Sequence, residues 1–389
     1  MEIQQRYINF IITDTLQLQA GEALSINASR SHFDFAQDLA QQAVETTLLP
    51  VHLVIIDAGK PKEVHTYDPQ ITKQYTDPPL RSVLLRIDDT EHRSLELHQE
   101  LEQISQSPAL LQQGGNLGSP QLNQPVAPWS VIPVPGPLWA LQILGDQATK
   151  TDLWKLFDTI LFQQEPWIEA LSVLKQRMRE LNRLELVRLQ LKGPNIDLRL
   201  DIVEQSRFRC GLHTLNDGRE FVPYLPPFRL SSLLNRDGAS GTFSSSEPFY
   251  LFGKLIEKAR FTFFQGELID VDAAQGKEVL TQAFGLDDGA SRLSEISLVE
   301  ADNPYAAFRK PTGYQGFDAC RTNSLVFGMG EASHIEALAQ YDDEDDLQRC
   351  TGCNTSLLHL RIPIGALDVT GYDELDDEIE IMRNGHFVL

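Results

Sequence analysis

The stretch V-R-L-Q-L-K-G-P-N-I-D-L-R-L-D-I, residues 187–202, decides the fold, because the periodicity of the chain changes there. Apolar and polar residues alternate on both sides of G-P-N, which predicts a β-hairpin. Before this stretch, helical patterns alternate with short apolar runs, and after it further alternating ribbons follow. We therefore predict an N-terminal α/β domain at residues 1–185 and a C-terminal α+β domain at residues 186–389.

The segment before the hairpin has the pattern of repeated βαβ units. The predicted strands cover residues 23–27, 51–57, 82–88 and 129–135, and the predicted helices cover residues 8–16, 33–44 and 150–183. Strands that alternate with helices favour a doubly wound parallel sheet with helices on both faces. The Gln-, Gly- and Pro-rich residues 107–125 are typical of a loop.

The segment after the hairpin has the pattern of an antiparallel α+β domain. Residues 258–265 and 266–273 alternate as strands do, and a helix is predicted at 276–284. The polar run N-R-D-G-A-S-G-T-F-S-S-S-E, residues 235–247, predicts a loop. The acidic run at 342–346 is most simply a solvated turn, with a cation site as the alternative.

Composition limits the classes of partner. The net charge of -22 argues against sequence-independent binding of nucleic acid and against binding to an anionic membrane surface, since both need clustered Lys and Arg. No run approaches the ~20 apolar residues that span a bilayer, and the start of the chain lacks the pattern of a signal peptide. We therefore expect a cytoplasmic protein that binds small molecules, peptides or proteins.

The four cysteines, Cys210, Cys320, Cys350 and Cys353, are too few for a disulfide framework in 389 residues, so we expect thiols. One C-x-x-C pair without a second is a weak zinc signal. A Cys3His set of Cys320, Cys350, Cys353 and His359 remains the alternative to buried or loop thiols. No P-loop, G-x-S-x-G or G-x-G-x-x-G motif is present.

The stretch C-N-T-S-L-L-H-L-R-I-P-I-G, residues 353–365, raises a question about chemistry. If residues 357–362 form a strand, His359 and Arg361 project from the same face. An imidazole next to a carboxylate would indicate a metal site, but an imidazole next to a guanidinium does not.

Several longer motifs relate the chain to a known family. They are Y-I-N-F-I-I-T-D-T-L-Q-L-Q-A-G-E-A-L-S-I (7–26), W-S-V-I-P-V-P-G-P-L-W-A (129–140), L-K-G-P-N-I-D-L-R-L (191–200), N-D-G-R-E-F-V-P-Y-L-P (216–226) and G-E-L-I-D-V-D-A-A-Q-G-K-E-V-L (266–280). In this order they resemble the metallo-aminopeptidases of the aminopeptidase T and aminopeptidase S type, a leucyl aminopeptidase family. The resemblance implies a cleft in the C-terminal domain with two metal ions, which activate a water and polarise the scissile carbonyl.

The metal ligands that the resemblance implies are only partly present. Glu295, in R-L-S-E-I-S-L-V, and His359 stand at the positions of a glutamate and a histidine ligand. Arg361 stands where the family has an aspartate, and Arg229, in P-P-F-R-L-S-S-L-L, stands at the first glutamate. Each surviving residue also has a structural interpretation, His359 as a core histidine bonded to a carbonyl and Glu295 as a helix-to-strand cap or an ion-pair partner.

The remaining histidine ligand is also replaced. It corresponds to Ser324 or Val326, depending on a two-residue shift in F-D-A-C-R-T-N-S-L-V-F-G. Two metal ions need carboxylates to neutralise and bridge them, whereas guanidinium groups stay charged at any relevant pH. A cation and a guanidinium repel by ~4 kcal/mol per unit charge at 4 Å with an effective dielectric of 20. The substitutions therefore disfavour the two-metal site.

Three hypotheses follow from this comparison. The first is a metal-free, aminopeptidase-like pseudoenzyme or altered enzyme, in which Glu295, Arg229 and Arg361 form the site. The second is an active aminopeptidase that uses zinc, cobalt or manganese, with ligands rebuilt from Glu295, His359, Glu331, His334 and the acidic run at 342–346. The third is a non-heme iron ring-cleaving dioxygenase on a similar scaffold, although its carboxylate ligand position holds Arg361.

The partners expected from this comparison are a peptide or a small carboxylate-bearing ligand, which a guanidinium can bind through two hydrogen bonds. The resemblance also implies a homodimer. Neither nucleic acid nor a membrane is expected as a partner, because of the acidic charge.

Overall fold

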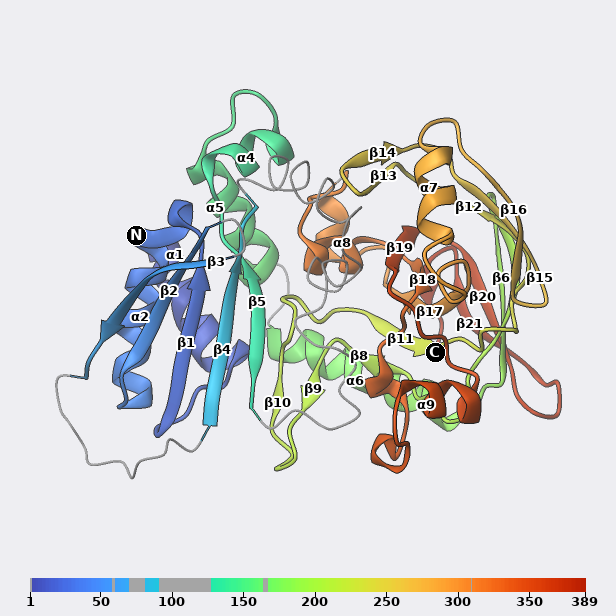
Figure 1. Cartoon of the computed structure of the whole chain (residues 1–389), viewed down its shortest axis with the longest axis horizontal. Helices are drawn as coiled ribbons and strands as arrows, with labels where there is room; N and C mark the ends of the chain where they lie inside the picture. The colour runs from blue at the N-terminus through green and yellow to red at the C-terminus, as the bar shows by residue number, and fades with distance from the viewer. Residues whose placement is uncertain (1, 58–59, 70–80, 91–126, 164–166, 309) are drawn as a thin grey trace.

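The computed structural model describes residues 2–57, 60–69, 81–90, 127–163, 167–308 and 310–389. It is a mixed α/β protein, as expected, with one group of sheet and helices built from the N-terminal residues and a larger group built from the rest (Figure 1). The predicted loop at 107–125 lies outside the described residues. Among the described residues, no helix is both long enough and apolar enough to cross a membrane.

The N-terminal sheet has the strand order β3-β2-β1-β4-β5. Its strands are β1 (Glu22–Ala28), β2 (Val51–Asp57), β3 (Lys60–Tyr67), β4 (Arg81–Asp88) and β5 (Trp129–Pro133). Strand β1 pairs in parallel with β2 and β4, and β4 pairs in parallel with β5, which confirms the parallel core of the sheet. The expectation of a wholly parallel sheet was wrong, because β3 returns antiparallel along the edge of β2.

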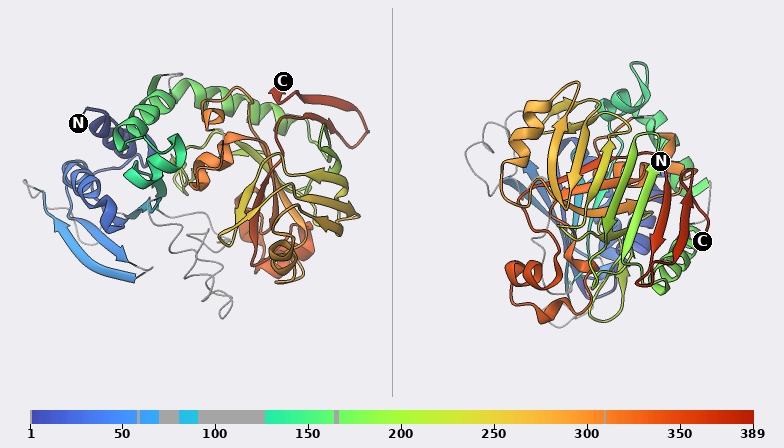
Figure 2. Two further views of the ribbon diagram at one scale, coloured as in Figure 1. Left: turned by 90° about the horizontal axis from the view of Figure 1, so that it is seen from above. Right: turned by 90° about the vertical axis from the view of Figure 1, so that its right-hand side faces the viewer.

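The helices of this part confirm the predicted amphipathic patterns. They are α1 (Glu2–Phe10), η1 (Ile11–Thr15), η2 (Arg30–His32), α2 (Phe33–Thr47), α4 (Pro137–Leu144), α5 (Lys150–Asp158), η4 (Thr159–Gln163) and α6 (Trp167–Arg183). Helix α5 begins with a capping box between Thr149 and Asp152, which satisfies amide groups of the first turn. Helix α6 runs from the N-terminal group toward the C-terminal sheets (Figure 2).

The predicted hairpin is confirmed and lies in the middle of an eight-stranded antiparallel sheet of order β16-β15-β12-β7-β6-β20-β21-β22. The strands are β6 (Arg188–Gly193), β7 (Ile196–Asp201), β12 (Ser240–Ser244), β15 (Arg260–Phe264), β16 (Glu267–Asp272), β20 (Asp368–Tyr372), β21 (Glu378–Arg383) and β22 (His386–Phe387). The sheet therefore joins the two ends of the C-terminal half of the chain.

The predicted loop at 235–247 was wrong in part, because β12 lies inside it and pairs with both β7 and β15. Phe243 is the apolar anchor of this strand, and its ring lies 4.8 Å from the ring of Phe261. Gly241 has a φ of +123°, and a Cβ there would meet the carbonyl oxygen of Asp197 at 2.3 Å. The glycine that suggests a loop is thus required by close packing of two strands.

A second C-terminal sheet has the order β19-β18-β17-β11-β8. Its strands are β8 (Arg209–Cys210), β11 (Leu230–Leu233), β17 (Leu293–Leu298), β18 (Ser324–Gly328) and β19 (His359–Pro363). Phe327 of β18 packs against Phe243, Phe261 and Phe263 of the eight-stranded sheet, with ring centroids 6.2, 5.1 and 5.8 Å away. One face of this sheet is therefore apolar and covered by the larger sheet.

Short strands and helices complete the C-terminal part. They are β9 (His213–Thr214), β10 (Glu220–Phe221), β13 (Phe249–Leu251), β14 (Lys254–Ile256), α7 (Lys277–Phe284), η5 (Pro304–Ala307), α8 (Gln315–Arg321), η6 (Ala332–His334), η7 (Leu338–Gln340) and α9 (Glu344–Thr351). The acidic run begins α9 and is not a simple turn. The Asp343 carboxylate caps the helix by accepting from the Asp346 amide, where the helix dipole favours negative charge.

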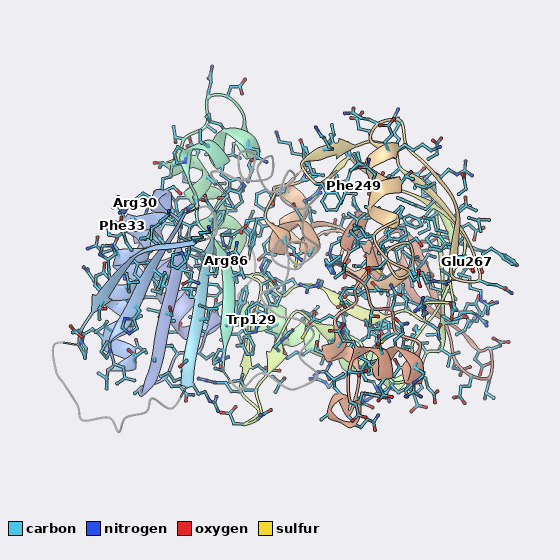
Figure 3. All side chains as sticks on the ribbon, viewed as in Figure 1. Arg30, Phe33, Arg86, Trp129, Phe249 and Glu267 are labelled. Carbon is cyan, nitrogen blue, oxygen red and sulfur yellow. The ribbon has the colours of Figure 1, made fainter. Side chains whose placement is uncertain are left out.

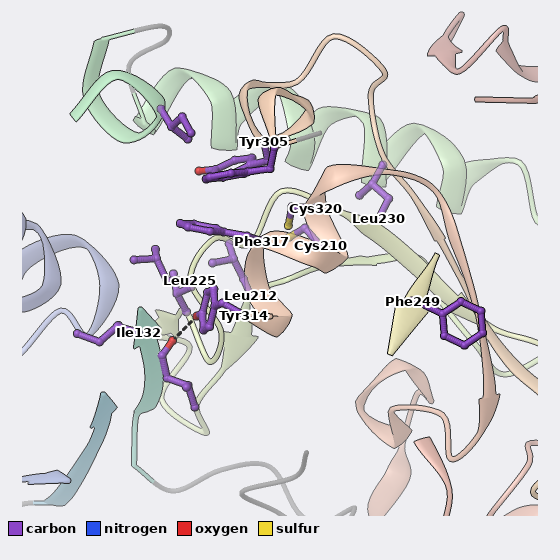
Figure 4. Packing of buried hydrophobic residues seen from close by; sticks show 14 of the residues in the cluster. Ile132, Cys210, Leu212, Leu225, Leu230, Phe249, Tyr305, Tyr314, Phe317 and Cys320 are labelled. Carbon is purple, nitrogen blue, oxygen red and sulfur yellow. Dashed lines mark hydrogen bonds between the residues drawn. The ribbon is translucent and has the colours of Figure 1, made fainter. Parts of the chain in front are cut away.

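Buried contacts join the two parts of the molecule. The hydroxyl of Tyr314 donates to the carbonyl of Val131 at 2.8 Å within a shared apolar cluster (Figure 4). Arg219, between β9 and β10, donates to both carboxylate oxygens of Glu22 on β1, at 2.5 and 3.2 Å. The side chains of this ion pair are 7% and 2% exposed.

Breaking that pair will destabilise the protein. We expect Arg219→Met to lower the free energy of unfolding by about 3–5 kcal/mol, because the Glu22 carboxylate would stay buried without its partner. Urea unfolding followed by circular dichroism measures the change. Asp217→Asn, which breaks the exposed ion pair with Arg81 near the same turn, should leave stability close to that of the unmodified protein. Equal losses in both variants would contradict the argument.

Candidate functional site

The other face of the five-stranded sheet is polar, and it holds the residues predicted from the sequence. Glu295 of β17 lies opposite Val326 of β18, which lies opposite Arg361 of β19. Directly paired residues project from the same face, so these three positions form a row across three neighbouring strands. Ser297 and Ser324 form the next row on that face. Ser324 and Val326, the two positions to which the resemblance assigns a histidine ligand, therefore lie beside Glu295.

Arg361 connects the polar side chains of the two rows. Its Nη1 donates to Ser297 at 2.7 Å and to Ser324 at 2.9 Å, and its Nη2 donates to the Glu295 carboxylate at 3.3 Å. Ser297 in turn donates to Glu295 at 3.2 Å. Burial raises the pKa of Glu295, but the neighbouring positive groups, Arg361 first and then His334 and Arg229, together outweigh burial and leave the pKa below the ordinary value. The structure thus brings Glu295 and Arg361 together as an ion pair.

Arg229 lies just before β11 and is 8% exposed. Burial alone would lower its pKa, yet Cys320, Glu331 and Glu295 raise it, so the guanidinium stays charged. Its Nε has no hydrogen-bond partner, and among the described residues no carboxylate forms an ion pair with it. The structure therefore leaves a buried cation near Glu295 without a direct counter-ion on the described part of the chain.

His359 projects from the same face of β19 as Arg361, which confirms the predicted alternation. Its Nδ1 lies 3.0 Å from the carbonyl oxygen of Met329, which can only accept, so Nδ1 carries the hydrogen. Its Nε2 is buried and has no hydrogen-bond partner on the part of the chain that the structure describes. Burial and the charge of Arg361 lower the pKa of His359, which favours the neutral ring.

A second polar cluster adjoins the row. Glu331 pairs with His213 of β9 and accepts from Ser333 at 2.7 Å. Burial raises the pKa of Glu331, but the charge of His213 and its hydrogen bond hold that pKa well below the ordinary value. His213 also packs edge-on against Trp129, with ring centroids 6.1 Å apart. Trp129 belongs to β5 of the N-terminal sheet and is labelled in Figure 3. The cluster therefore connects the site to the N-terminal part.

These residues do not fit a metal centre. Within the described ranges, no group of three or more His, Cys, Asp or Glu side chains could hold a metal ion. Glu295 is paired with a guanidinium, and the acidic run is engaged at the start of α9. Among the residues that the structure describes, neither the Cys3His set nor the rebuilt ligand set is therefore brought together. The donor chemistry supports no step through a metal ion.

The comparisons with known proteins identify the family. Residues 2–387 match the thermophilic metalloprotease family M29. The chain belongs to this family. The resemblance seen in the sequence is thereby confirmed.

Three relatives indicate the degree of similarity within the M29 family. Aminopeptidase T from Thermus thermophilus is 30% identical over 280 residues, aminopeptidase T from Thermus aquaticus is 29% identical over 274, and aminopeptidase 2 from Geobacillus stearothermophilus is 28% identical over 269. Each match covers 67–68% of this chain and 65–66% of the relative. The structure of wild-type AmpT from Thermus thermophilus matches with a TM-score of 0.79 over 100% of this chain and 99% of that one, at 22% identity. That likeness shows the fold.

Sequence reasoning missed several residues of the polar face. His213 belongs to no motif, and Ser231 lies in P-P-F-R-L-S-S-L-L without a predicted role. In the sequence, 118 residues separate His213 from its partner Glu331. Only the pairing of strands brings such residues together. Glu331 and His334 were predicted as parts of a rebuilt metal site, but in the structure they bond to His213 and Ser231.

The buried charges predict a pH dependence of stability. The pKa of His359 in the folded protein lies below the 6.5 expected in the unfolded chain. As the pH falls below 6.5, His359 therefore takes up a proton in the unfolded chain before it does so in the folded protein. The free energy of unfolding should therefore decrease there, by at most ~1.4 kcal/mol per pH unit for one proton. Stability from Glu331, present above pH 4.5, is lost as the pH falls through its lower folded pKa. Urea unfolding at several pH values measures both losses of stability. His359→Gln should remove the decrease in the free energy of unfolding that begins below pH 6.5 and leave the decrease below pH 4.5 unchanged.

Proposed function

We propose that this M29-family protein has lost the two-metal peptidase site and binds a small carboxylate-bearing ligand or peptide through guanidinium groups. The observation that carries the proposal is the ion pair between Arg361 and Glu295, 3.3 Å apart, at two positions where the family resemblance implies metal ligands. The guanidinium supplies within the protein the positive charge that a metal ion would supply. Glu295 is thus neutralised and the sheet folds without metal.

Arg229 is the group that we assign to the ligand. A guanidinium that is 8% exposed and lacks a direct carboxylate partner on the described chain carries a large desolvation cost. A ligand carboxylate offsets that cost, because it accepts two parallel charge-assisted hydrogen bonds from the fork of the guanidinium. The unpaired Nε2 of His359 is an acceptor on the same sheet face, so the ligand can also donate a hydrogen bond there.

The proposal also covers the domain organisation, the oligomeric state and the location of the protein. We propose that residues 1–185 and 186–389 are separate domains, that the cleft belongs to the second, and that the protein is a cytoplasmic homodimer without nucleic-acid or membrane partners. The acidic charge of -22 supports the exclusion of polyanions. The activity of the curated relatives is not assigned to this chain, since each match covers only about two thirds of the relative's length.

Two measurements test the proposal. Elemental analysis before and after dialysis against zinc, cobalt and manganese should find far less than one ion per chain. Calorimetric titration should show binding of N-acetyl-leucine and leucyl-leucine, but not of leucinamide, which lacks the carboxylate. Arg229→Met should weaken carboxylate binding by about 10- to 150-fold, the equivalent of a charge-assisted hydrogen bond. Arg207→Met, at an exposed arginine paired with Glu336, is the matched control and should bind normally.

Two ions held tightly by each chain, together with metal-stimulated release of leucine from leucyl-leucine, would favour the active aminopeptidase. Equal affinities for N-acetyl-leucine and leucinamide would instead show that Arg229 does not recognise the ligand carboxylate.

A further inference from the structure

A serine and a histidine form a hydrogen-bonded pair on the polar face that the proposed function leaves unused. Ser231 of β11 lies directly opposite Ser297 of β17, as Leu233 lies opposite Glu295, so the Ser231 side chain projects from the Glu295 face. Its Oγ lies 2.8 Å from Nε2 of His334. Both side chains are nearly covered, with 3% and 2% exposed.

The tautomer of His334 is set by its second hydrogen bond. Its Nδ1 lies 2.7 Å from the carbonyl oxygen of Glu331, which can only accept, so Nδ1 carries the hydrogen. In the neutral ring, Nε2 then has a free lone pair and the Ser231 hydroxyl is the donor. This is the arrangement in which a histidine takes the proton of a serine nucleophile, with the carbonyl of Glu331 in the orienting role.

The residues around the pair hold this geometry. Glu331 is fixed through its carboxylate by His213 and Ser333, so its carbonyl is a firm support for His334. Arg229 comes two residues before Ser231 and has no direct carboxylate partner on the described chain. A ligand carboxylate bound by Arg229 would therefore lie close to the Ser231 hydroxyl.

We propose that Ser231 is the nucleophile of a metal-free acyl-transfer site, with His334 as its general base, acting on small esters or amides that carry a carboxylate. Oγ forms a bond to the acyl carbon while its proton passes to Nε2, and the leaving alcohol or amine takes that proton as its bond to carbon breaks. Water then attacks the acyl carbon and gives its proton to Nε2 of His334, the bond between that carbon and Oγ breaks, and Oγ takes the proton back, which releases the acid and restores Ser231. Only the requirement for a carboxylate rests on the proposed function of Arg229.

Labelling with diisopropyl fluorophosphate, a small neutral reagent, tests the nucleophile without relying on Arg229. We expect peptide mass spectrometry to find the label on Ser231, at a rate that EDTA does not change. His334→Gln should slow labelling about 100-fold or more, the usual contribution of a general base. Ser232→Ala is the matched control, because the buried Ser232 bonds to Ser206 and not to His334. In this variant Ser231 should be labelled at the same rate as in the unmodified protein.

A second variant keeps the test valid if Ser231→Ala fails to fold. Ser231→Cys should be alkylated at position 231 by iodoacetamide, and more slowly when His334→Gln is added. No label at Ser231 in folded protein, or equal rates with and without His334, would overturn the inference. If the protein binds carboxylates but Ser231 is not labelled, the proposed function stands and only this inference is rejected. If Ser231 is labelled but carboxylates do not bind, the nucleophile stands and the proposed function is rejected.

Discussion

Replacing Arg361 by methionine will lower the free energy of unfolding by about 3–5 kcal/mol, the usual cost of a buried charge that loses its partner. The Glu295 side chain is 2% exposed and Arg361 is its ion-pair partner at 3.3 Å. The substitution also removes hydrogen bonds of 2.7 and 2.9 Å to Ser297 and Ser324. Urea unfolding at pH 7 measures the loss, and the loss should shrink as the pH falls and Glu295 becomes protonated.

The matched control removes both charges. Glu295→Gln combined with Arg361→Met leaves no uncompensated charge, so the double variant should be more stable than Arg361→Met alone. A single variant as stable as the unmodified protein would show that the ion pair does not replace a metal charge. A double variant that is less stable by the sum of both single losses would show that the two residues act independently.

The strands and helices with regular apolar spacing could be predicted from the sequence. The hairpin at 187–202 and strands such as β1 and β4 bury one or both faces, so their periodicity is a direct record of burial. Strand β3 (Lys60–Tyr67) was missed because it lies at an edge with almost all of its side chains exposed or half-buried, and so has no apolar pattern. Strand β12 was missed because its small residues are selected by close backbone approach.

The site was predictable only in part. The alternation of a strand places His359 and Arg361 on one face from local sequence alone. The meeting of Arg361 with Glu295, 66 residues away in sequence, was suggested by family resemblance, because no local rule relates the two positions. Ser231 and His334 are 103 residues apart and no motif relates them, so only the register between β11 and β17 reveals which face the serine occupies.

Placing metal-binding side chains on this face should create a zinc site. Val326 pairs with both Glu295 and Arg361, so Val326→His combined with Arg361→Asp would place an imidazole between two carboxylates across neighbouring strands. Three such donors with an open position match a catalytic zinc site. We expect the double variant to bind one equivalent of Zn²⁺ by elemental analysis, where the unmodified chain retains far less.

The stability of that double variant supplies an independent test. Without metal, the carboxylate introduced at position 361 would face the buried carboxylate of Glu295, and two like charges in one site destabilise the fold. Added Zn²⁺ should therefore raise the Tm of the double variant, since a ligand that binds only the folded state stabilises it. Glu295→Gln in the same background should abolish the increase, because two donors do not complete the site. If zinc raises the Tm equally with and without Glu295, the metal binds elsewhere, and Arg361 is not the residue that stands in for the lost ions.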